Sequence, residues 1–159
     1  MRTQCCFALL LVLVLAACTR NGGAATASTA TATQANASAS TTVGGVTLQT
    51  TTVAIKDLNA AVAGRYGIDR SREGVLLLVT VRDATGNSID PGDLQLQATA
   101  GTLTEAPKPL PLRAITTDGM TDYIGTFHSG APASVQFRLT ATRGGSRADI
   151  ATTAELYPR

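Results

Sequence analysis

The chain has 159 residues and a formal net charge of +2, with 44% hydrophobic and only 15% charged residues. A chain of this length is usually one domain, and its low charge content suits strands and loops better than long helices. The chain lacks a run of Lys or Arg and is nearly neutral, so we expect no binding to nucleic acid through charge.

Residues 1–17 have the features of a secretory signal. Arg2 is followed by the apolar run 7–15, which is shorter than the roughly 20 residues of a transmembrane helix, and small residues close the segment. All three cysteines lie at or before position 18, so the remainder offers no disulfide framework, thiolate zinc site or cysteine nucleophile. Without residues 1–17 the chain keeps 12 basic and 11 acidic residues, a net charge of +1.

The end of this leader, Leu15-Ala16-Ala17-Cys18, resembles the lipobox of bacterial lipoproteins. The resemblance implies a diacylglyceryl thioether on Cys18, cleavage just before it and acylation of the new amino group with a fatty acid such as palmitate. Two acyl chains hold a protein stably on a membrane. The residue after Cys18 is Thr19 rather than aspartate, which by the same resemblance favours the outer membrane, with the protein facing the periplasm.

Residues 18–44 are predicted to be the lipidated cysteine and a disordered tether rich in Thr, Ala and Ser. The segment has no aromatic or long aliphatic side chain before Val43, so it buries too little apolar area to offset the entropy of ordering. Its root-mean-square reach is of order 25–30 Å. We therefore expect the folded domain to hang from the membrane by this tether.

The predicted domain, residues 45–159, begins with a strand region marked by Val46, Leu48, Val53 and Ile55. The parity of the apolar positions slips between the two pairs, which predicts a break or bulge. A short helix follows, with Asp57 as its N-terminal cap and Gly67 as its left-handed end. Leu58, Val62 and Tyr66 are spaced four apart and define its apolar face.

Strands dominate the rest of the chain. The run 75–81 is apolar on both faces and suits a central strand, whereas the prolines beside Leu110 and Leu112 indicate an edge. Further strands alternate apolar and polar residues at 94–100, 123–127, 135–141 and 148–156, with Gly144-Gly145-Ser146 as a hairpin turn. The spacing predicts a mainly β chain: an antiparallel, immunoglobulin-like β-sandwich with one short N-terminal helix.

Two stretches of the domain resemble a domain-of-unknown-function family of small envelope proteins of Gram-negative bacteria. The first is 63–71, AGRYGIDRS, with the strand 77–81 after it, and the second is 123–127, YIGTF. The resemblance covers roughly residues 46–159 and implies a periplasmic β-rich domain. It supplies no activity, substrate or catalytic residue, and the lipid cysteine departs from the plain cleavable signal of many members.

The strongest candidate site is a cluster near the end of the predicted helix, formed by Tyr66, Arg70, Ser71 and Arg72. A tyrosine beside two arginines can present a small anionic or peptide-binding patch. The alternative is that Tyr66 packs on the sheet while the arginines pair with Asp69 or Glu73, so that the cluster serves folding alone.

Other candidates have simpler explanations in their local sequence. His128 and Ser129 are adjacent in a strand region and point to opposite faces, so they are poorly placed as a base and nucleophile. Asp118 and Asp122 lie in a stretch, 117–122, that is typical of a loop. A calcium site would use Asp83, Asn87, Asp90 and Asp93, but their spacing is not that of an EF-hand and fits turns.

The sequence therefore predicts a non-enzymatic binding or accessory module, anchored to the membrane through Cys18, with no cofactor, no metal and an envelope protein as a possible partner. Two alternatives stay open. One is a structural lipoprotein that maintains envelope integrity without a defined ligand, and the other is a periplasmic hydrolase that would depend on Asp118, Asp122 or His128.

Overall fold

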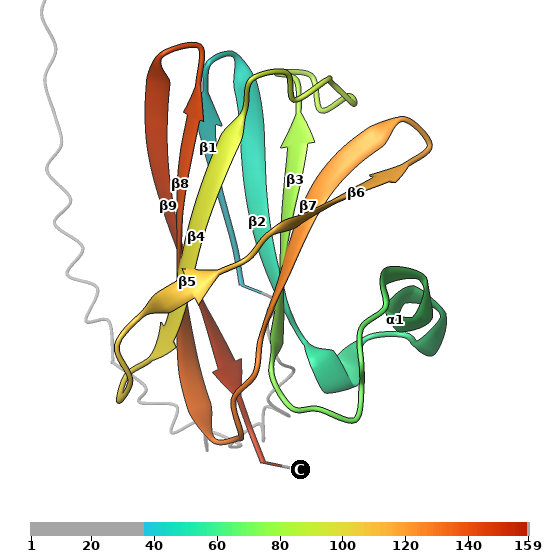
Figure 1. Cartoon of the computed structure of the whole chain (residues 1–159), viewed down its shortest axis with the longest axis vertical. Helices are drawn as coiled ribbons and strands as arrows, with labels where there is room; N and C mark the ends of the chain where they lie inside the picture. The colour runs from blue at the N-terminus through green and yellow to red at the C-terminus, as the bar shows by residue number, and fades with distance from the viewer. Residues whose placement is uncertain (1–36, 159) are drawn as a thin grey trace, which may run out of the picture. The chain divides into compact units, whose positions relative to one another are not determined.

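The computed structural model describes residues 37–158, which form two antiparallel β-sheets and one short α-helix (Figure 1). The predicted signal, Cys18 and the tether as far as residue 36 lie outside the described residues. The strands are β1 (Ser38–Val43), β2 (Val46–Ala54), β3 (Val75–Arg82), β4 (Gln95–Thr102), β5 (Lys108–Leu110), β6 (Arg113–Thr117), β7 (Met120–Phe127), β8 (Ala133–Arg143) and β9 (Ser146–Leu156). The helical segments are a 3-10 turn, Ile55–Asp57, and the helix α1, Ala60–Tyr66.

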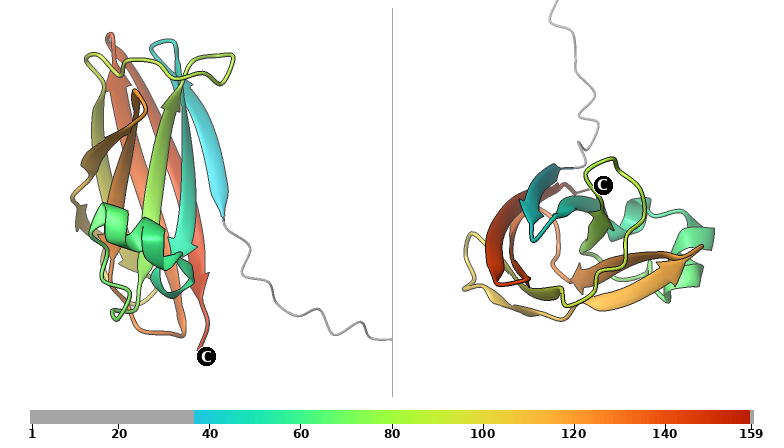
Figure 2. Two further views of the ribbon diagram at one scale, coloured as in Figure 1. Left: turned by 90° about the vertical axis from the view of Figure 1, so that its right-hand side faces the viewer. Right: turned by 90° about the horizontal axis from the view of Figure 1, so that it is seen from above.

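The two sheets confirm the predicted β-sandwich. One has the strand order β1-β2-β3-β7-β6 and the other the order β5-β4-β8-β9, with every neighbouring pair antiparallel. Figure 2 shows the sheets facing each other, with α1 outside the sandwich. β3 is the central strand of its sheet and β5 is an edge, as the sequence predicts. Among the described residues, no helix has the length and apolar character needed to cross a bilayer.

The core lies between the sheets and is built by alternation along the strands. Val135, Phe137, Leu139 and Ala141 of β8 are all at most 2% exposed, as the sequence predicts, and the residues between them face outward or are only partly buried. The ring of Phe137 meets that of Phe127 from the facing sheet edge to face, with centroids 6.5 Å apart.

The first strand, β1, corrects the predicted boundary of the tether, because residues 38–43 are ordered rather than disordered. Taken alone, the segment is too polar to fold, but β2 supplies a backbone ladder that runs from the pair Ser38 and Thr51 to the pair Val43 and Val46. Gly44 and Gly45, both at positive φ, form the two-residue turn that this hairpin requires. Val43 is only 2% exposed and fastens the strand to the core.

The predicted break in the second strand is wrong. β2 pairs with β3 without interruption, and Thr50 and Thr52 take the core positions that follow Val46 and Leu48. The change in apolar parity has another cause: Val53 faces the opposite side of the sheet, where it packs beneath α1.

The short N-terminal helix is confirmed, and its left-handed end is Gly67, with φ of 63°. Its cap is not Asp57: the side chain of Asn59 accepts a hydrogen bond from the backbone N–H of Ala61 at 2.8 Å. Val62 is 38% exposed, so it does not belong to the buried face. The helix instead seats Ala63 on the outer face of the five-stranded sheet, in a second cluster with Leu58, Leu76 and Ile124.

The expected loop at 117–122 is a β-hairpin, so that expectation is wrong. Asp118 and Gly119, with φ of 51° and 76°, form a two-residue turn between β6 and β7. Thr117 and Asp122 belong to strands, and β6 becomes the outermost strand of the five-stranded sheet. Polar residues around Asp-Gly are typical of a loop, but this turn type also favours Asp-Gly.

Candidate functional site

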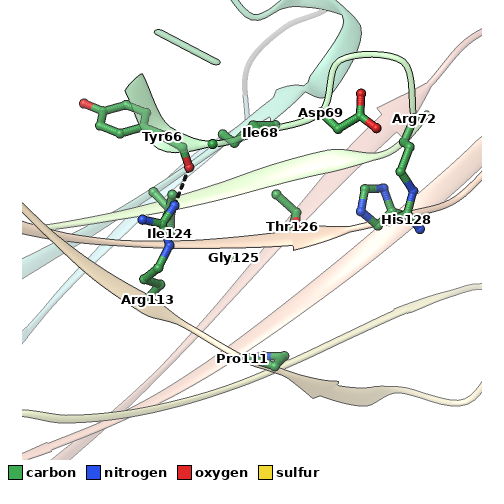
Figure 3. Close-up of a pocket in the computed structure, with 11 residues that line it drawn as sticks. Tyr66, Ile68, Asp69, Arg72, Pro111, Arg113, Ile124, Gly125, Thr126 and His128 are labelled. Atoms are coloured by element: carbon green, nitrogen blue, oxygen red, sulfur yellow. Dashed lines mark hydrogen bonds between the residues drawn. The ribbon is translucent and has the colours of Figure 1, made fainter. Parts of the chain in front are cut away.

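A cavity of about 290 Å³ lies where the end of α1 meets strands β6 and β7 (Figure 3). The helix end and the turn after it contribute the residues 66–69 and Arg72, and β7 contributes 124–126 as the floor. Pro111 and Arg113 border the cavity on one side and His128 on another. The cavity therefore combines segments that are far apart in the sequence.

Arg113, the first residue of β6, fastens the helix end to the sheet. Its guanidinium donates a hydrogen bond to the main-chain carbonyl of Tyr66, the last residue of α1 (Figure 3). The last carbonyls of a helix lack partners within the helix and carry partial negative charge, so a guanidinium is favourable there. The contact also holds the charge of Arg113 beside the cavity.

Asp69 carries the carboxylate of the cavity wall. It accepts hydrogen bonds from the backbone N–H of Ser71 at 2.9 Å and from the Ser71 hydroxyl at 2.7 Å. These two bonds, with smaller contributions from Arg72 and His128, lower the pKa of Asp69 below its ordinary value. Asp69 is thus an ionised group committed to the turn that positions Arg72.

Arg72 and His128 lie next to each other on the opposite side of the cavity from Tyr66 (Figure 3). His128 Nδ1 donates to the main-chain carbonyl of Glu73 at 3.2 Å, because a carbonyl oxygen only accepts. Within residues 37–158, neither Arg72 nor Arg113 has a carboxylate within ion-pair distance. A guanidinium group thus borders each side of the cavity, Arg72 beside His128 and Arg113 beside Tyr66, and guanidinium groups are suited to holding an anion.

The structure divides the predicted patch. Tyr66 and Arg72 line the cavity, but Arg70 turns away and donates to the main-chain carbonyl of Lys56 at 3.3 Å. The sequence interpretation missed Arg113, because 47 residues separate it from the Tyr66 carbonyl that it contacts. It also did not connect His128 with Arg72. No spacing in the sequence signals either relationship.

The groups considered for hydrolysis are not brought together. Asp122 is ion-paired with Arg82 at 2.8 Å, and Asp118 lies at the tip of the hairpin. His128 follows the opposite end of β7, roughly 20 Å from Asp122 at the usual rise of a strand. The Ser129 hydroxyl donates to the carbonyl of Gly130 at 3.3 Å.

The carboxylates considered for calcium serve turns. Asp83 Oδ1 accepts from Thr85 N, Thr85 Oγ1 and Asn87 N at 2.7–2.8 Å, and these bonds lower its pKa. Asp90 accepts from Gly92 N, and Asp93 from Gly144 N, both at 2.9 Å. In residues 37–158 there is no group of three or more His, Cys, Asp or Glu side chains arranged to hold a metal ion.

Comparison with solved structures gives several proteins with the same fold. A DUF4426 family protein from Pseudomonas aeruginosa PAO1 superposes with a TM-score of 0.60 at 17% identity, covering 77% of this chain and 96% of the other. FetP from uropathogenic E. coli strain F11, expressed in the periplasm of E. coli, gives 0.52 at 11% identity over 77% and 95%. A copper-bound variant of FetP, in which one glutamate is replaced by glutamine, gives 0.53 at 10% identity over 78% and 92%.

A search of the curated proteins finds no match to the chain. Residues 40–159 match the family model of a domain of unknown function, DUF4426. The match takes in both stretches, 63–71 and 123–127, on which the resemblance was based, and it confirms that resemblance. The chain belongs to the DUF4426 family.

Proposed function

We propose that this protein is a lipid-anchored binding module of the cell envelope, and that it holds an anionic group in the cavity at the end of α1. The observation that carries the proposal is the placement of Arg72, Arg113 and His128 around one cavity, with Asp69 as its carboxylate. Asp69 is already engaged by Ser71, and Arg113 uses one of its donors on the Tyr66 carbonyl, so Arg72 and the other donors of Arg113 are available to a ligand.

The size and composition of the cavity limit the ligand to a small group. A volume of about 290 Å³ is at the lower end of ligand sites, and guanidinium groups pair with carboxylate or phosphate oxygens in two-pronged geometry. Ile68 and Ile124 add an apolar floor beside these charges. A carboxylate or phosphate on a small, partly apolar carrier fits this combination.

The anchor rests on the sequence motif at Leu15–Cys18. Attachment at Cys18, after a cleaved signal at 1–17, would hold the domain at the outer membrane, facing the periplasm. The periplasmic expression of FetP, a protein of the same fold, supports an envelope location. Cys18 joins the domain through residues 19–37, because β1 begins at Ser38.

Copper is not part of the proposal. Copper is bound in the FetP variant, but this chain has a single histidine, His128, and no cysteine after Cys18. Copper sites use imidazole and sulfur ligands in combination. In this chain the His128 ring lies beside Arg72 at the cavity, and the positive charge of the guanidinium disfavours a cation there.

Titration calorimetry with succinate and with phosphate at low salt tests the proposal. We expect heat of binding for at least one anion, and added salt should lower the affinity because the attraction is between charges. Arg72→Gln should lower the affinity about tenfold or more. Arg138→Gln, a matched change at an exposed arginine of β8 outside the cavity, should leave the affinity unchanged. No heat with either anion, or equal loss in both variants, would favour a structural lipoprotein without a ligand.

A further inference from the structure

Among the described strands, β6 is the sheet edge that stays open. β5 is short and contains Pro109, with Pro107 and Pro111 on either side, which removes backbone donors from that edge. β1 and β9, the remaining edges, lie against each other where the two sheets meet. β6 contains no proline, and its outer side faces away from the sandwich (Figure 1).

The hairpin geometry fixes which backbone groups of β6 point outward. The Asp118-Gly119 turn makes Thr117–Met120 the closing, hydrogen-bonded pair of the ladder. Hydrogen-bonded pairs alternate along an antiparallel ladder, so Arg113 and Ile115 also direct their backbone groups toward β7. The N–H and C=O of Ala114 and Thr116 therefore point away from the sheet, and both residues are exposed.

The open edge leads into the charged cavity. Arg113 is the first residue of β6, and both it and Pro111 border the cavity. The side chain of Arg113 lies on the same face as α1, because it reaches the Tyr66 carbonyl. An extended segment that paired antiparallel with β6 would begin near Thr117 and end beside Arg113, so its carboxyl end would arrive at the cavity.

We propose that β6 accepts an extended peptide as an additional antiparallel strand, and that Arg113, at the start of β6, holds the peptide's terminal carboxylate. The partner is thus a protein or peptide with a free, extended C-terminus. Main-chain hydrogen bonds to Ala114 and Thr116 supply affinity, and the carboxylate fixes direction and register. This inference rests on the proposed function, since it identifies the carrier of the anionic group that the cavity holds.

The test uses a pool of N-acetylated hexapeptides randomised at every position and made in two forms, with a free carboxyl terminus or as the amide. After incubation with the purified protein, bound peptides are identified by mass spectrometry. We expect free acids to be retained at least about tenfold over amides, since a charge-assisted contact contributes about one decade in affinity. Equal retention of the two forms, or no retention of either, would overturn the inference.

Two further measurements address the edge itself. Thr116→Pro removes an outward N–H and should abolish retention, while Thr116→Val keeps the backbone donor and should bind as the unchanged protein does. Because proline can disturb the strand, hydrogen exchange on the unchanged protein provides a second readout: the amides of Ala114 and Thr116 should become protected when peptide binds. Unchanged exchange at these two amides would contradict strand addition.

The outcomes separate the two proposals. Succinate binding without a preference for peptide acids would remove the strand-addition inference and leave the anion site standing. Failure of succinate, phosphate and peptide acids to bind would remove the proposed function as well.

Discussion

The guanidinium of Arg113 and the main-chain carbonyl of Tyr66 join an edge strand to the end of a helix across 47 residues of sequence. The contact closes one side of the cavity and places a cation where β6 begins. It also explains why a helix as short as α1 has a defined position, since isolated helices of this length are not stable and need tertiary contacts.

Two substitutions of Arg113 distinguish the effect of its charge from that of its planar guanidinium group. Arg113→Met should weaken anion binding about tenfold and speed hydrogen exchange at the end of α1, since both the ligand contact and the Tyr66 bond are lost. Arg113→Lys should recover part of the affinity, because the charge returns without the planar fork. Calorimetry and exchange mass spectrometry measure the two effects; a methionine variant that binds normally would exclude Arg113 from the site.

Inside the sandwich, Thr50 of β2 and Thr152 of β9 bring their hydroxyl oxygens to 2.6 Å, and Thr50 Oγ1 also donates to the carbonyl of Ala39 at 3.2 Å. Thr152 must then donate to Thr50. Thr50→Val alone should lower the free energy of unfolding by about 1–3 kcal/mol, because it strands the Thr152 hydroxyl, whereas Thr50→Val with Thr152→Val should be nearly neutral. Urea unfolding of the unchanged protein, Thr50→Val, Thr152→Val and the double variant measures the cycle, and additive losses would contradict the pairing.

Asp83 predicts a pH dependence of stability. Hydrogen bonds from the Thr85 side chain and the Asn87 backbone lower its pKa in the folded state below 3.8, so ionisation favours folding. That contribution is complete above pH 3.8 and is lost as the pH falls through the lower folded value. The stability difference between the unchanged protein and Asp83→Asn should therefore shrink on acidification below this pH. A difference in unfolding midpoint that stays constant from neutral pH to about pH 2 would argue against it.

The anchor predicts a covalent lipid at one position. Intact cells fed a clickable fatty acid should label the protein, and Cys18→Ala should abolish the label. Cys5→Ala and Cys6→Ala are matched controls, because both cysteines lie within the leader that cleavage removes. Mass spectrometry of the native protein would contradict the anchor if the terminus carried no lipid.

The parts of the fold that follow from sequence are those where a local pattern coincides with burial. Three features could be predicted from the local sequence: the alternation of β8, the Gly144-Gly145 turn and the apolar run of β3. In both strands the pattern of buried residues follows the pattern of apolar residues. Gly67 belongs with them, because a glycine directly after a helical pattern is typical of a left-handed helix end.

The remaining elements depend on partners distant in sequence. β1 is polar along most of its length and folds because β2 and the core give it a ladder and a place for Val43. Thr50 and Thr52 can enter the core because their hydroxyls have hydrogen-bond partners there. The Thr50 hydroxyl bonds to Thr152 and to the carbonyl of Ala39, and the Thr52 hydroxyl donates to the carbonyl of Ala37. No alternation pattern in the sequence reveals these partners. The cavity is of the same kind: Arg113 and His128 join Tyr66 and Arg72 through tertiary structure alone.

The most direct test of the anion site is a map of where succinate acts on the protein. In two-dimensional NMR of the purified, isotope-labelled protein, added succinate should shift the guanidinium Nε–H signals of Arg72 and Arg113 and the backbone signals of residues 66–69, while the Nε–H signal of Arg138 stays in place. Shifts scattered over all exposed arginines, or none at the end of α1, would contradict a specific anion site in this cavity.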